Sequence, residues 1–268
     1  MKEHIAILGV GKMGKSIAKG LLSKHVVTPT NLILTKPHPK DLQEFKRLAV
    51  RVTSNNQEAV RIADVIILAV KPQTMEQLLY EIGPMITKDQ LIISVAAGVT
   101  IENVEEKIGH DKAIVRVMPN LCAQIGESAS AWVTNRNVTK RQKLVIKTIL
   151  KTMGIEVYLQ NQNLLDAVTA ISGSGPAYFF LISQLLKKAA LNMGLSAEIS
   201  EKLIRQTFFG SAELLKGTSM SMENLITAVA SKGGATEAAL AQFYKNGFSE
   251  LFLDGVYAAQ KRTTQLKI

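Results

Sequence analysis

The feature that most constrains the fold is a glycine-rich segment directly after a short apolar run near the N-terminus. Residues 5–8 are Ile-Ala-Ile-Leu, and they lead into Gly9-x-Gly11-x-x-Gly14, after which apolar residues recur at helical spacing. A strand, this glycine turn and a helix in succession are typical of dinucleotide-binding domains. There Gly9 permits the tight turn, Gly11 lets the pyrophosphate approach the backbone, and Gly14 lets helix and strand pack closely. The alternative is a purely structural glycine turn.

Strand and helix patterns then alternate as far as residue 160. Aliphatic runs predict further strands at residues 31–35, 65–70, 91–95 and 113–117. Helices are expected from residue 56 or 57 to 63 and over 140–153, with a last strand at 156–159. The chain is therefore predicted to be an α/β protein whose residues 1–160 form a doubly wound (Rossmann) parallel sheet.

The loops that follow these strands are the expected ligand loops, because open α/β sheets bind ligands at the carboxyl ends of their strands. Pro72 ends the strand at 65–70, so the loop there should face the cofactor. Ala96, Ala97 and Gly98 are small enough for a flat ring to lie close to the backbone.

The residues after the second strand predict which dinucleotide binds. An NAD-specific site places an acidic residue there to hold the ribose 2′-hydroxyl, but this chain has Thr35 and Lys36. A hydroxyl and an ammonium can bind a 2′-phosphate, so we predict a preference for NADP(H), with NAD(H) possible. Asp41 lies too far along the sequence to replace the missing acid with confidence. The alternative is that Lys36 is a solvated loop lysine.

From residue 161 onward, helical periodicity replaces the strand patterns. Helices are predicted over 164–171, from 175 to 192, and over 197–215, 222–230, 234–244 and 248–261. The helix that begins at Gly175-Pro176 is apolar nearly all round and should be buried. Residues 161–268 are thus predicted to be an all-helical domain partly covered by a second subunit. A self-contained helical domain is the alternative.

A second anion-binding segment is predicted within this helical region. Gly233 and Gly234 precede a strongly helix-forming run that includes Thr236. A helix that begins after two glycines presents free backbone N–H groups to a carboxylate or phosphate. The Thr236 hydroxyl can donate to or accept from the bound group. A flexible turn capped by Thr236 is the alternative.

Composition narrows the functional class. With 268 residues, 47% of them hydrophobic, the chain can bury a full core. Its one cysteine, Cys122, allows no intrachain disulfide, so a reducing, cytoplasmic location is expected. No metal site is predicted, because the sequence has neither a CxxC motif nor a cluster of histidine and cysteine. No signal peptide or membrane-spanning run is expected. The net charge of +10 is spread along the chain and aromatic residues make up 5%, so we predict no nucleic-acid partner.

Six sequence blocks, in this order, resemble the pyrroline-5-carboxylate reductase family: residues 9–14, 69–72, 94–98, 118–120, 172–178 and 231–236. The resemblance covers essentially the whole chain, and the last two blocks are its specific part. It implies NAD(P)H-dependent reduction of the cyclic imine 1-pyrroline-5-carboxylate to L-proline, the last step of proline biosynthesis. It also implies homo-oligomers, dimers that often assemble into decamers, formed through the helical C-terminal dimerisation domain.

The resemblance also assigns residues. It implies a cofactor site made of Leu8, Gly9, Val10, Gly11, Lys12, Met13, Gly14, Thr35, Lys36, Asn56, Ala69, Val70, Lys71, Pro72, Val95, Ala96 and Ala97. It implies a substrate site made of Asn120, Ser231, Gly233, Gly234, Ala235 and Thr236. Within that site Thr236 is the expected catalytic residue, with its hydroxyl against the ring nitrogen. A protonated cyclic imine is already electrophilic, so the enzyme needs mainly to align it and exclude water.

Two other functions remain open. A β-hydroxyacid dehydrogenase would need a lysine one helical turn after Gly175, where this chain has Phe179. A non-catalytic NADP-binding regulator is the second alternative. It is kept open by Lys232, which stands where many members of the resembled family have proline, and by Ser219, which stands where some members have glutamate.

Overall fold

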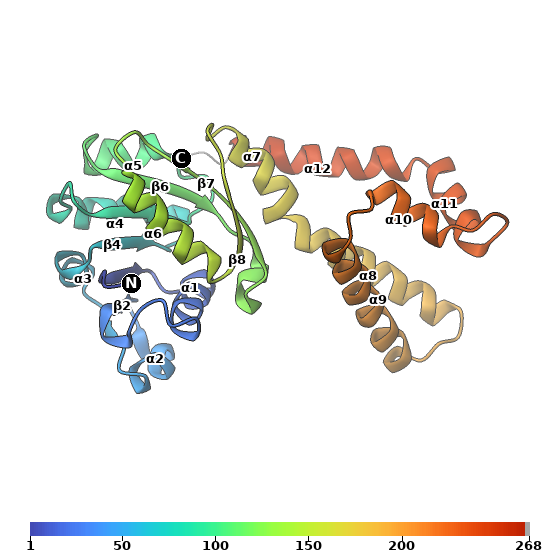
Figure 1. Ribbon diagram of the computed structural model, residues 1–268, viewed down its shortest axis with the longest axis horizontal. Coiled ribbons are helices and arrows are strands. Elements are labelled where there is room, and N and C mark those ends of the chain that lie inside the picture. The colour runs from blue at the N-terminus through green and yellow to red at the C-terminus, as the bar shows by residue number, and fades with distance from the viewer. Residues whose placement is uncertain (266–268) are drawn as a thin grey trace. The chain divides into compact units, whose positions relative to one another are not determined.

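The computed structural model describes residues 1–265, which form two compact units (Figure 1). Of the described residues, unit 1 comprises 1–174 and 259–265, and unit 2 comprises 175–258. The predicted boundary after residue 160 precedes this division. The difference arises because helix α7 (Leu164–Val168) packs on the sheet of unit 1, where Leu165 is fully buried.

The sheet of unit 1 has eight strands in the order β3-β2-β1-β4-β5-β6-β7-β8. They are β1 (Ile5–Leu8), β2 (Leu32–Thr35), β3 (Arg51–Thr53), β4 (Val65–Leu68), β5 (Leu91–Ser94), β6 (Ala113–Met118), β7 (Ser128–Thr134) and β8 (Gly154–Tyr158). Strands β1 to β6 are parallel. Their order is that of dinucleotide-binding folds, which confirms the predicted architecture.

Helices cover both faces of this sheet, as the alternation of strand side chains requires. Ile5 and Ile7 of β1 belong to one core, and Ala6 and Leu8 belong to the other. The first core is closed by α1 (Lys12–Ser23), α2 (Gln43–Arg47) and α6 (Lys140–Lys151). The second is closed by α3 (Asn56–Ile62), α4 (Met75–Ile82), α5 (Ile101–Ile108) and α7 (Figure 1). Because both faces are buried, the strands are continuously aliphatic in sequence.

Strands β7 and β8 depart from the predicted all-parallel sheet. Strand β7 is antiparallel to β6, and β8 is parallel to β7. The β6–β7 connection includes only the 3₁₀ turn Leu121–Ile125 and its flanking residues. A parallel crossover needs a dozen residues or more, so this short connection turns the chain back beside β6.

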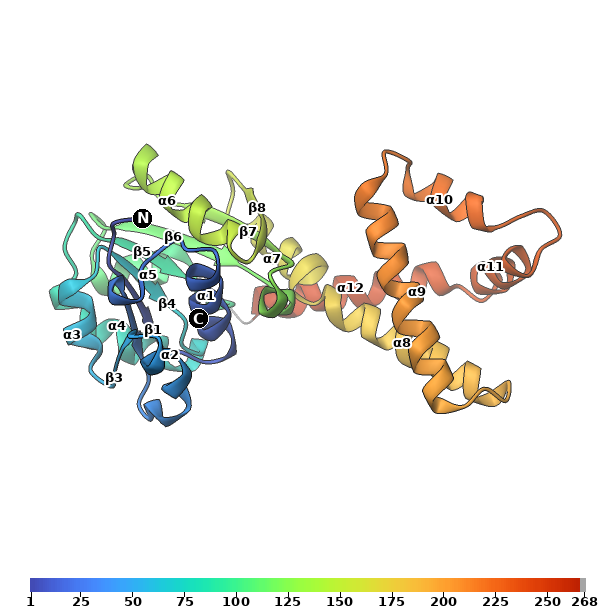
Figure 2. The same ribbon diagram turned by 60° about the horizontal axis from the view of Figure 1, so that its bottom comes forward.

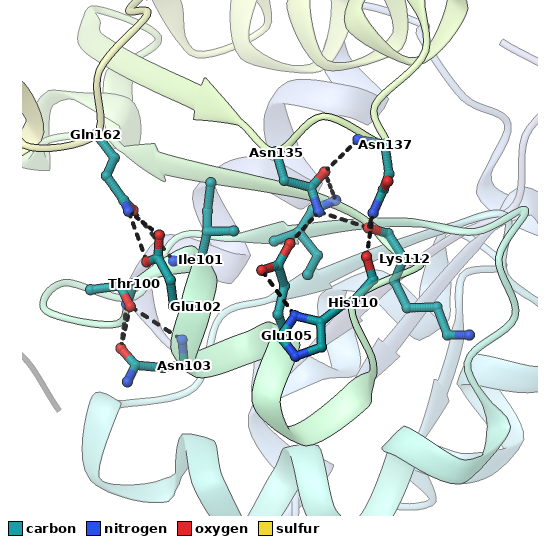
Figure 3. Close-up of polar contacts among 11 residues, drawn as sticks. Thr100, Ile101, Glu102, Asn103, Glu105, His110, Lys112, Asn135, Asn137 and Gln162 are labelled. Atoms are coloured by element: carbon teal, nitrogen blue, oxygen red, sulfur yellow. Dashed lines mark hydrogen bonds and ion pairs between the residues drawn. The ribbon is translucent and has the colours of Figure 1, made fainter.

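A polar cluster ties α5 to strands β6 and β7 (Figure 3). The side chain of Asn135, which follows β7, accepts hydrogen bonds from the backbone N–H of Ile114 at 3.1 Å and of Asn137 at 3.3 Å. Its Nδ2 donates to the backbone oxygen of Lys112 and to Oε1 of Glu105, both at 2.8 Å. One side chain therefore satisfies backbone groups of two chain segments and fixes a helix beside them.

The opposite end of α5 is also held by side chains (Figure 3). Thr100 and Asn103 form a capping box at its N-terminus. Gln162 Nε2 donates to both carboxylate oxygens of Glu102, at 2.6 and 2.8 Å. The chain leading into α7 is thereby fixed to α5.

Replacing Asn135 with alanine should destabilise the protein by about 2–4 kcal/mol, because it leaves partly buried backbone groups without partners. Urea denaturation of the full chain measures this loss. Asn31→Ala is the control, since the Asn31 side chain donates one bond, to the Lys2 oxygen at 3.2 Å, near the surface. The control should lose less than about 1 kcal/mol. Equal losses for the two variants would contradict the anchoring role of Asn135.

Unit 2 is helical, which confirms the predicted all-helical region. It contains α8 (Gly175–Asn192), α9 (Ala197–Gly217), α10 (Met222–Val229), α11 (Ala235–Lys245) and the first part of α12 (Phe248–Gln265). Helices α8 and α9 pack against each other (Figure 2).

The chain itself provides only part of the predicted burial of α8. Phe179 and Phe180 are 63% and 60% exposed, and Gly175 and Ala190 are the buried residues of this helix. The sequence is apolar on all sides of the helix, whereas its own chain covers only part of it. An exposed apolar surface of this extent is typical of a face that binds another protein.

The helical segment Leu164–Asn192 spans 29 residues and is long and apolar enough to cross a membrane by length and composition. The expectation that no run reaches membrane-spanning length is therefore wrong by this criterion. Apolar helices that pack against other protein segments satisfy the same criterion, so the segment does not by itself indicate a membrane protein.

Candidate functional site

The carboxyl ends of neighbouring strands bring the predicted cofactor-binding segments to one edge of the sheet. Leu8 at the end of β1 is in register with Thr35 of β2 and Leu68 of β4, and Leu68 is in register with Ser94 of β5. The residues that follow these strand ends include the predicted segments 9–14, 36, 69–72 and 95–97. The topology thus places together residues that are far apart in sequence.

The glycine turn has the local geometry that the sequence predicts. Gly9 has φ +80°, and its N–H donates to the Thr35 oxygen at 3.1 Å. A Cβ at Gly9 would lie 2.2 Å from Cγ1 of Val70, so position 9 excludes any side chain. A Cβ at Gly14 would lie 3.3 Å from Cγ2 of Ile7, which reflects the close packing of α1 on β1.

Gly11 leaves space for an anion at the N-terminus of α1. It is the N-cap residue, with φ −93°, and a Cβ added there would meet no atom within 4 Å. The first turn of α1 contains no acidic residue and has no side-chain cap. The first-turn N–H groups of Lys12, Met13 and Gly14 and the positive end of the helix dipole are therefore suited to a pyrophosphate.

The end of β2 carries the polar groups expected around the adenosine half. Thr35 is fully buried, and its hydroxyl donates to Oδ1 of Asn56 at 2.6 Å. Asn56 Nδ2 in turn donates to Oε2 of Glu81 at 3.1 Å. Lys36 follows on the chain and its side chain is 31% exposed. Glu81 was not predicted, because it lies on α4 and no sequence motif marks it.

Asp41 lies beside Lys36, although its position in the sequence predicts that it is too distant. The 3₁₀ turn Pro39–Leu42 folds the chain back and puts Asp41 Oδ2 2.5 Å from Lys36 Nζ. Lys15 Nζ is 3.5 Å from the same oxygen. The hydrogen bond from Lys36 holds the pKa of the Asp41 carboxyl below its ordinary value, so the carboxylate is charged at neutral pH. Pro39, a turn former, was the available sequence signal.

The loops after β4 and β5 complete this edge with small or apolar residues. The N–H of Ala69 donates to the Leu8 oxygen at 2.8 Å, and the N–H of Val95 donates to the Leu68 oxygen at 3.1 Å. These bonds continue the strand pairing into the loops and fix their starting points. Ala69, Val70, Pro72 and Val95 are partly exposed, and Lys71 and Ala97 are exposed, whereas Ala96 is buried.

The side-chain amide of Asn120 forms hydrogen bonds within unit 1. Its Oδ1 accepts from the N–H of Cys122 at 3.1 Å, and its Nδ2 donates to the backbone oxygen of Ser172 at 3.2 Å. Ser172 lies in the π-helical turn Thr169–Gly173 and donates its hydroxyl to the Ala129 oxygen at 2.9 Å. Asn120 therefore links the start of a surface turn to the chain leading into α8. Its predicted substrate contact stays a prediction.

In unit 2, some backbone N–H groups of the loop between α10 and α11 already donate hydrogen bonds to nearby residues. The N–H of Gly233 donates to Oε2 of Glu237 at 2.7 Å, and the N–H of Gly234 donates to the Ser231 oxygen at 2.9 Å. Gly234 is the N-cap of α11 and provides no side-chain cap. Within the described chain, the N–H groups of Ala235 and Thr236 have no such loop bonds, so they are the open donors of this segment.

Thr236 also borders a hollow on the inner side of this loop. The hollow has a volume of about 390 Å³ and is lined by α9, α10 and α11. Its other lining residues are Ser211, Leu214, Leu215, Met222, Leu225, Ile226, Val229 and Leu240. The Thr236 hydroxyl is therefore one of few polar groups on a largely apolar wall. Among residues 1–265, no group of three or more histidine, cysteine, aspartate or glutamate side chains is arranged to hold a metal ion.

Known proteins share this arrangement over the full length of the chain. The sequence profile of the pyrroline-5-carboxylate reductase dimerisation domain matches residues 162–266, and that of coenzyme F420-dependent NADP oxidoreductases matches residues 4–98. The pyrroline-5-carboxylate reductase of Pseudomonas aeruginosa is 35% identical, with 98% of this chain and 96% of that protein aligned. The chain belongs to the pyrroline-5-carboxylate reductase family.

Solved structures of pyrroline-5-carboxylate reductases agree with this assignment. The Coxiella burnetii enzyme has a TM-score of 0.94 and 33% identity, and the match covers 100% of both chains. A Plasmodium falciparum pyrroline carboxylate reductase, solved with NADP bound, has a TM-score of 0.90 and 31% identity over 99% of this chain and 98% of its own.

Membership of the pyrroline-5-carboxylate reductase family accounts for the exposed surface of α8. The matched dimerisation region, residues 162–266, includes this helix and the remaining helices of unit 2. The apolar side chains that the single chain leaves exposed belong to a dimerisation domain. The chain is therefore a homo-oligomer, which confirms the predicted second subunit.

Proposed function

We propose that the chain reduces 1-pyrroline-5-carboxylate to L-proline with NADPH, the last step of proline biosynthesis. The observation that carries this proposal is the similarity to pyrroline-5-carboxylate reductases over the whole chain, at 35% identity for the P. aeruginosa protein. Because the match covers both units, it includes the loop before α11 and the edge of the sheet at the carboxyl ends of β1, β2, β4 and β5, which we call the cofactor edge. The reaction requires both.

The cofactor edge has the groups that NADPH requires. When bound, NADPH supplies a hydride from C4 of its nicotinamide ring. We assign the pyrophosphate to the first turn of α1, where Gly11 leaves space, and the 2′-phosphate to Lys36. Thr35, predicted to share this role, is fully buried and donates its hydroxyl to Asn56, so it supports the site from below the surface. Asn56 is assigned to the adenosine, and residues 69–72 and 95–97 to the nicotinamide half.

The loop before α11 is assigned to the substrate. The open N–H groups of Ala235 and Thr236 suit a carboxylate, whereas the N–H of Gly233 already donates to the carboxylate of Glu237. The Thr236 hydroxyl is placed against the ring nitrogen, where it orients the imine. Asn120, Ser231, Gly233 and Gly234 remain in the proposed substrate site. No strong acid is needed, because the protonated imine is already electrophilic.

NADPH consumption by the purified protein tests this function. Rapid loss of NADPH absorbance with 1-pyrroline-5-carboxylate, with proline as the product, is expected. Parallel reactions with NADH and with a six-membered cyclic imine carboxylate measure cofactor preference and ring-size selectivity. NADPH binding without turnover of either imine would contradict the proposed function and favour the non-catalytic regulator.

Replacing Lys36 with glutamine should raise the KM for NADPH by about 10-fold, because one charge-assisted hydrogen bond to the 2′-phosphate is lost. The KM for NADH, which lacks that phosphate, should change little. Steady-state assays with the two cofactors measure the difference. Lys40→Gln, at an exposed position in the neighbouring turn, is the control. An equal rise for both cofactors would remove Lys36 from the 2′-phosphate site.

The proposal includes the assembly and location of the enzyme. The dimerisation region supports a dimer, and we propose that dimers assemble further, up to a decamer. We place the enzyme in the cytoplasm, with neither nucleic acid nor membrane as a partner. Light scattering after size-exclusion chromatography measures the assembly, and a monomer at micromolar concentration would contradict it.

A further inference from the structure

We propose that Asp41 sets cofactor selectivity by competing with the 2′-phosphate of NADPH for Lys36 and Lys15, which keeps the site open to NADH. This inference rests on the proposed NADPH site at the end of β2. It adds a residue that is absent from the predicted cofactor site and whose negative charge repels the phosphate.

The geometry places one carboxylate between two ammonium groups. Asp41 Oδ2 lies 2.5 Å from Lys36 Nζ and 3.5 Å from Lys15 Nζ. Lys15 also donates a hydrogen bond to the Asp41 backbone oxygen at 2.9 Å, which ties the turn to α1. The three side chains come from three elements, namely α1, the end of β2 and the 3₁₀ turn Pro39–Leu42.

Neighbouring acidic groups do not duplicate this arrangement. Glu44, on α2, pairs with Lys19 at 3.0 Å. Glu81 Oε2 accepts from Asn56 Nδ2, so it faces an amide rather than either lysine. Asp41 is thus the carboxylate that contacts the lysine assigned to the 2′-phosphate.

The charges act differently on the two cofactors. A 2′-phosphate carries a charge near −2 at neutral pH, so it is repelled by the Asp41 carboxylate and must share Lys36 with it. The ribose of NADH has a neutral 2′-hydroxyl, which can donate a hydrogen bond to a carboxylate. Asp41 therefore weakens binding of NADPH without weakening binding of NADH, and it reduces the preference for NADPH that Lys36 creates.

The test uses adenine nucleotides, which lack the nicotinamide half of the cofactor. Calorimetry with 2′,5′-ADP and with ADP compares a ligand that has the 2′-phosphate with one that lacks it. In Asp41→Asn, affinity for 2′,5′-ADP should rise by about 3- to 10-fold, the scale for removing one exposed opposing charge. Affinity for ADP should stay the same or fall. Unchanged or weaker 2′,5′-ADP binding, or an equal gain for both ligands, would overturn the proposal.

Two further variants give the test its controls. Asp111→Asn removes a carboxylate that contacts Lys112 at 3.0 Å, just before β6, and should leave both affinities unchanged. In a Lys36→Gln background, the effect of Asp41→Asn on 2′,5′-ADP should shrink, because the shared cation is gone. An undiminished effect there would contradict competition for Lys36. These binding measurements need no imine turnover, so they separate failure of this inference from failure of the proposed reaction.

Discussion

Alanine at position 11 weakens NADPH binding by about 10- to 100-fold, the scale of forcing one extra methyl group into a filled contact. The free protein has no atom within 4 Å of that methyl position, so the substitution has space until the pyrophosphate arrives. The φ angle of Gly11, −93°, is also ordinary for alanine. The stability of the free protein should therefore change by less than about 1 kcal/mol.

The other two glycines of the turn provide the contrast for this prediction. Gly9→Ala should destabilise the free protein by about 3 kcal/mol, since its Cβ would overlap Val70 at 2.2 Å in a backbone conformation that alanine disfavours. Gly14→Ala should be milder, because its Cβ would approach the flexible Ile7 side chain at 3.3 Å. Melting temperature and NADPH affinity together distinguish the three variants.

A shorter ligand identifies the cause of the Gly11→Ala defect. The fragment 2′-AMP carries the adenosine and the 2′-phosphate but has no pyrophosphate. Its affinity should be equal in Gly11→Ala and the unmodified protein. Equal loss of 2′-AMP and NADPH binding would indicate a general disturbance of the edge and contradict the assigned pyrophosphate position.

Replacing Thr236 with alanine should lower kcat/KM for 1-pyrroline-5-carboxylate by about 10- to 1,000-fold, the scale of one positioned hydrogen bond to a reacting centre. Thr236 occupies the first turn of α11, beside the two open N–H groups assigned to the substrate carboxylate. Loss of its hydroxyl removes the group proposed to orient the ring nitrogen. The affinity for NADPH should not change.

Two variants separate the hydroxyl from the shape of the Thr236 side chain. Thr236→Ser keeps the hydroxyl and should retain most of the activity, whereas Thr236→Val keeps the shape and should lose as much as alanine. Thr227→Val, on the neighbouring helix α10, is the control and should be fully active. Full activity in Thr236→Val would remove the hydroxyl from the catalytic role.

The parts of the fold that were predictable from sequence are those where one interaction dominates. Continuous aliphatic runs marked β1, β2, β4, β5 and β6 because both faces of each strand are buried. The spacing of the three glycines marked the cofactor turn, since each glycine meets a separate steric requirement. Strand β7 has the sequence SASAWVT, whose small polar residues carry little strand signal, and it was missed.

The parts that were not predictable depend on contacts between distant segments. The contact between Asp41 and Lys36 depends on the turn at Pro39, which brings together two side chains that are separated in the sequence. Helix α8 was expected to be buried because its sequence is apolar all round. A second subunit was predicted as well, but an apolar pattern on all sides does not identify which faces of α8 its own chain leaves exposed.

Transfer of deuterium from C4 of labelled NADPH to the product tests the central claim most directly. The purified protein is incubated with 1-pyrroline-5-carboxylate and NADPH deuterated on each face of C4 in turn, and proline is examined by mass spectrometry and NMR. We predict that one labelled face yields proline with a single deuterium on the ring carbon that was the imine carbon. Proline without deuterium from either face, or no proline at all, would contradict direct hydride transfer by this chain.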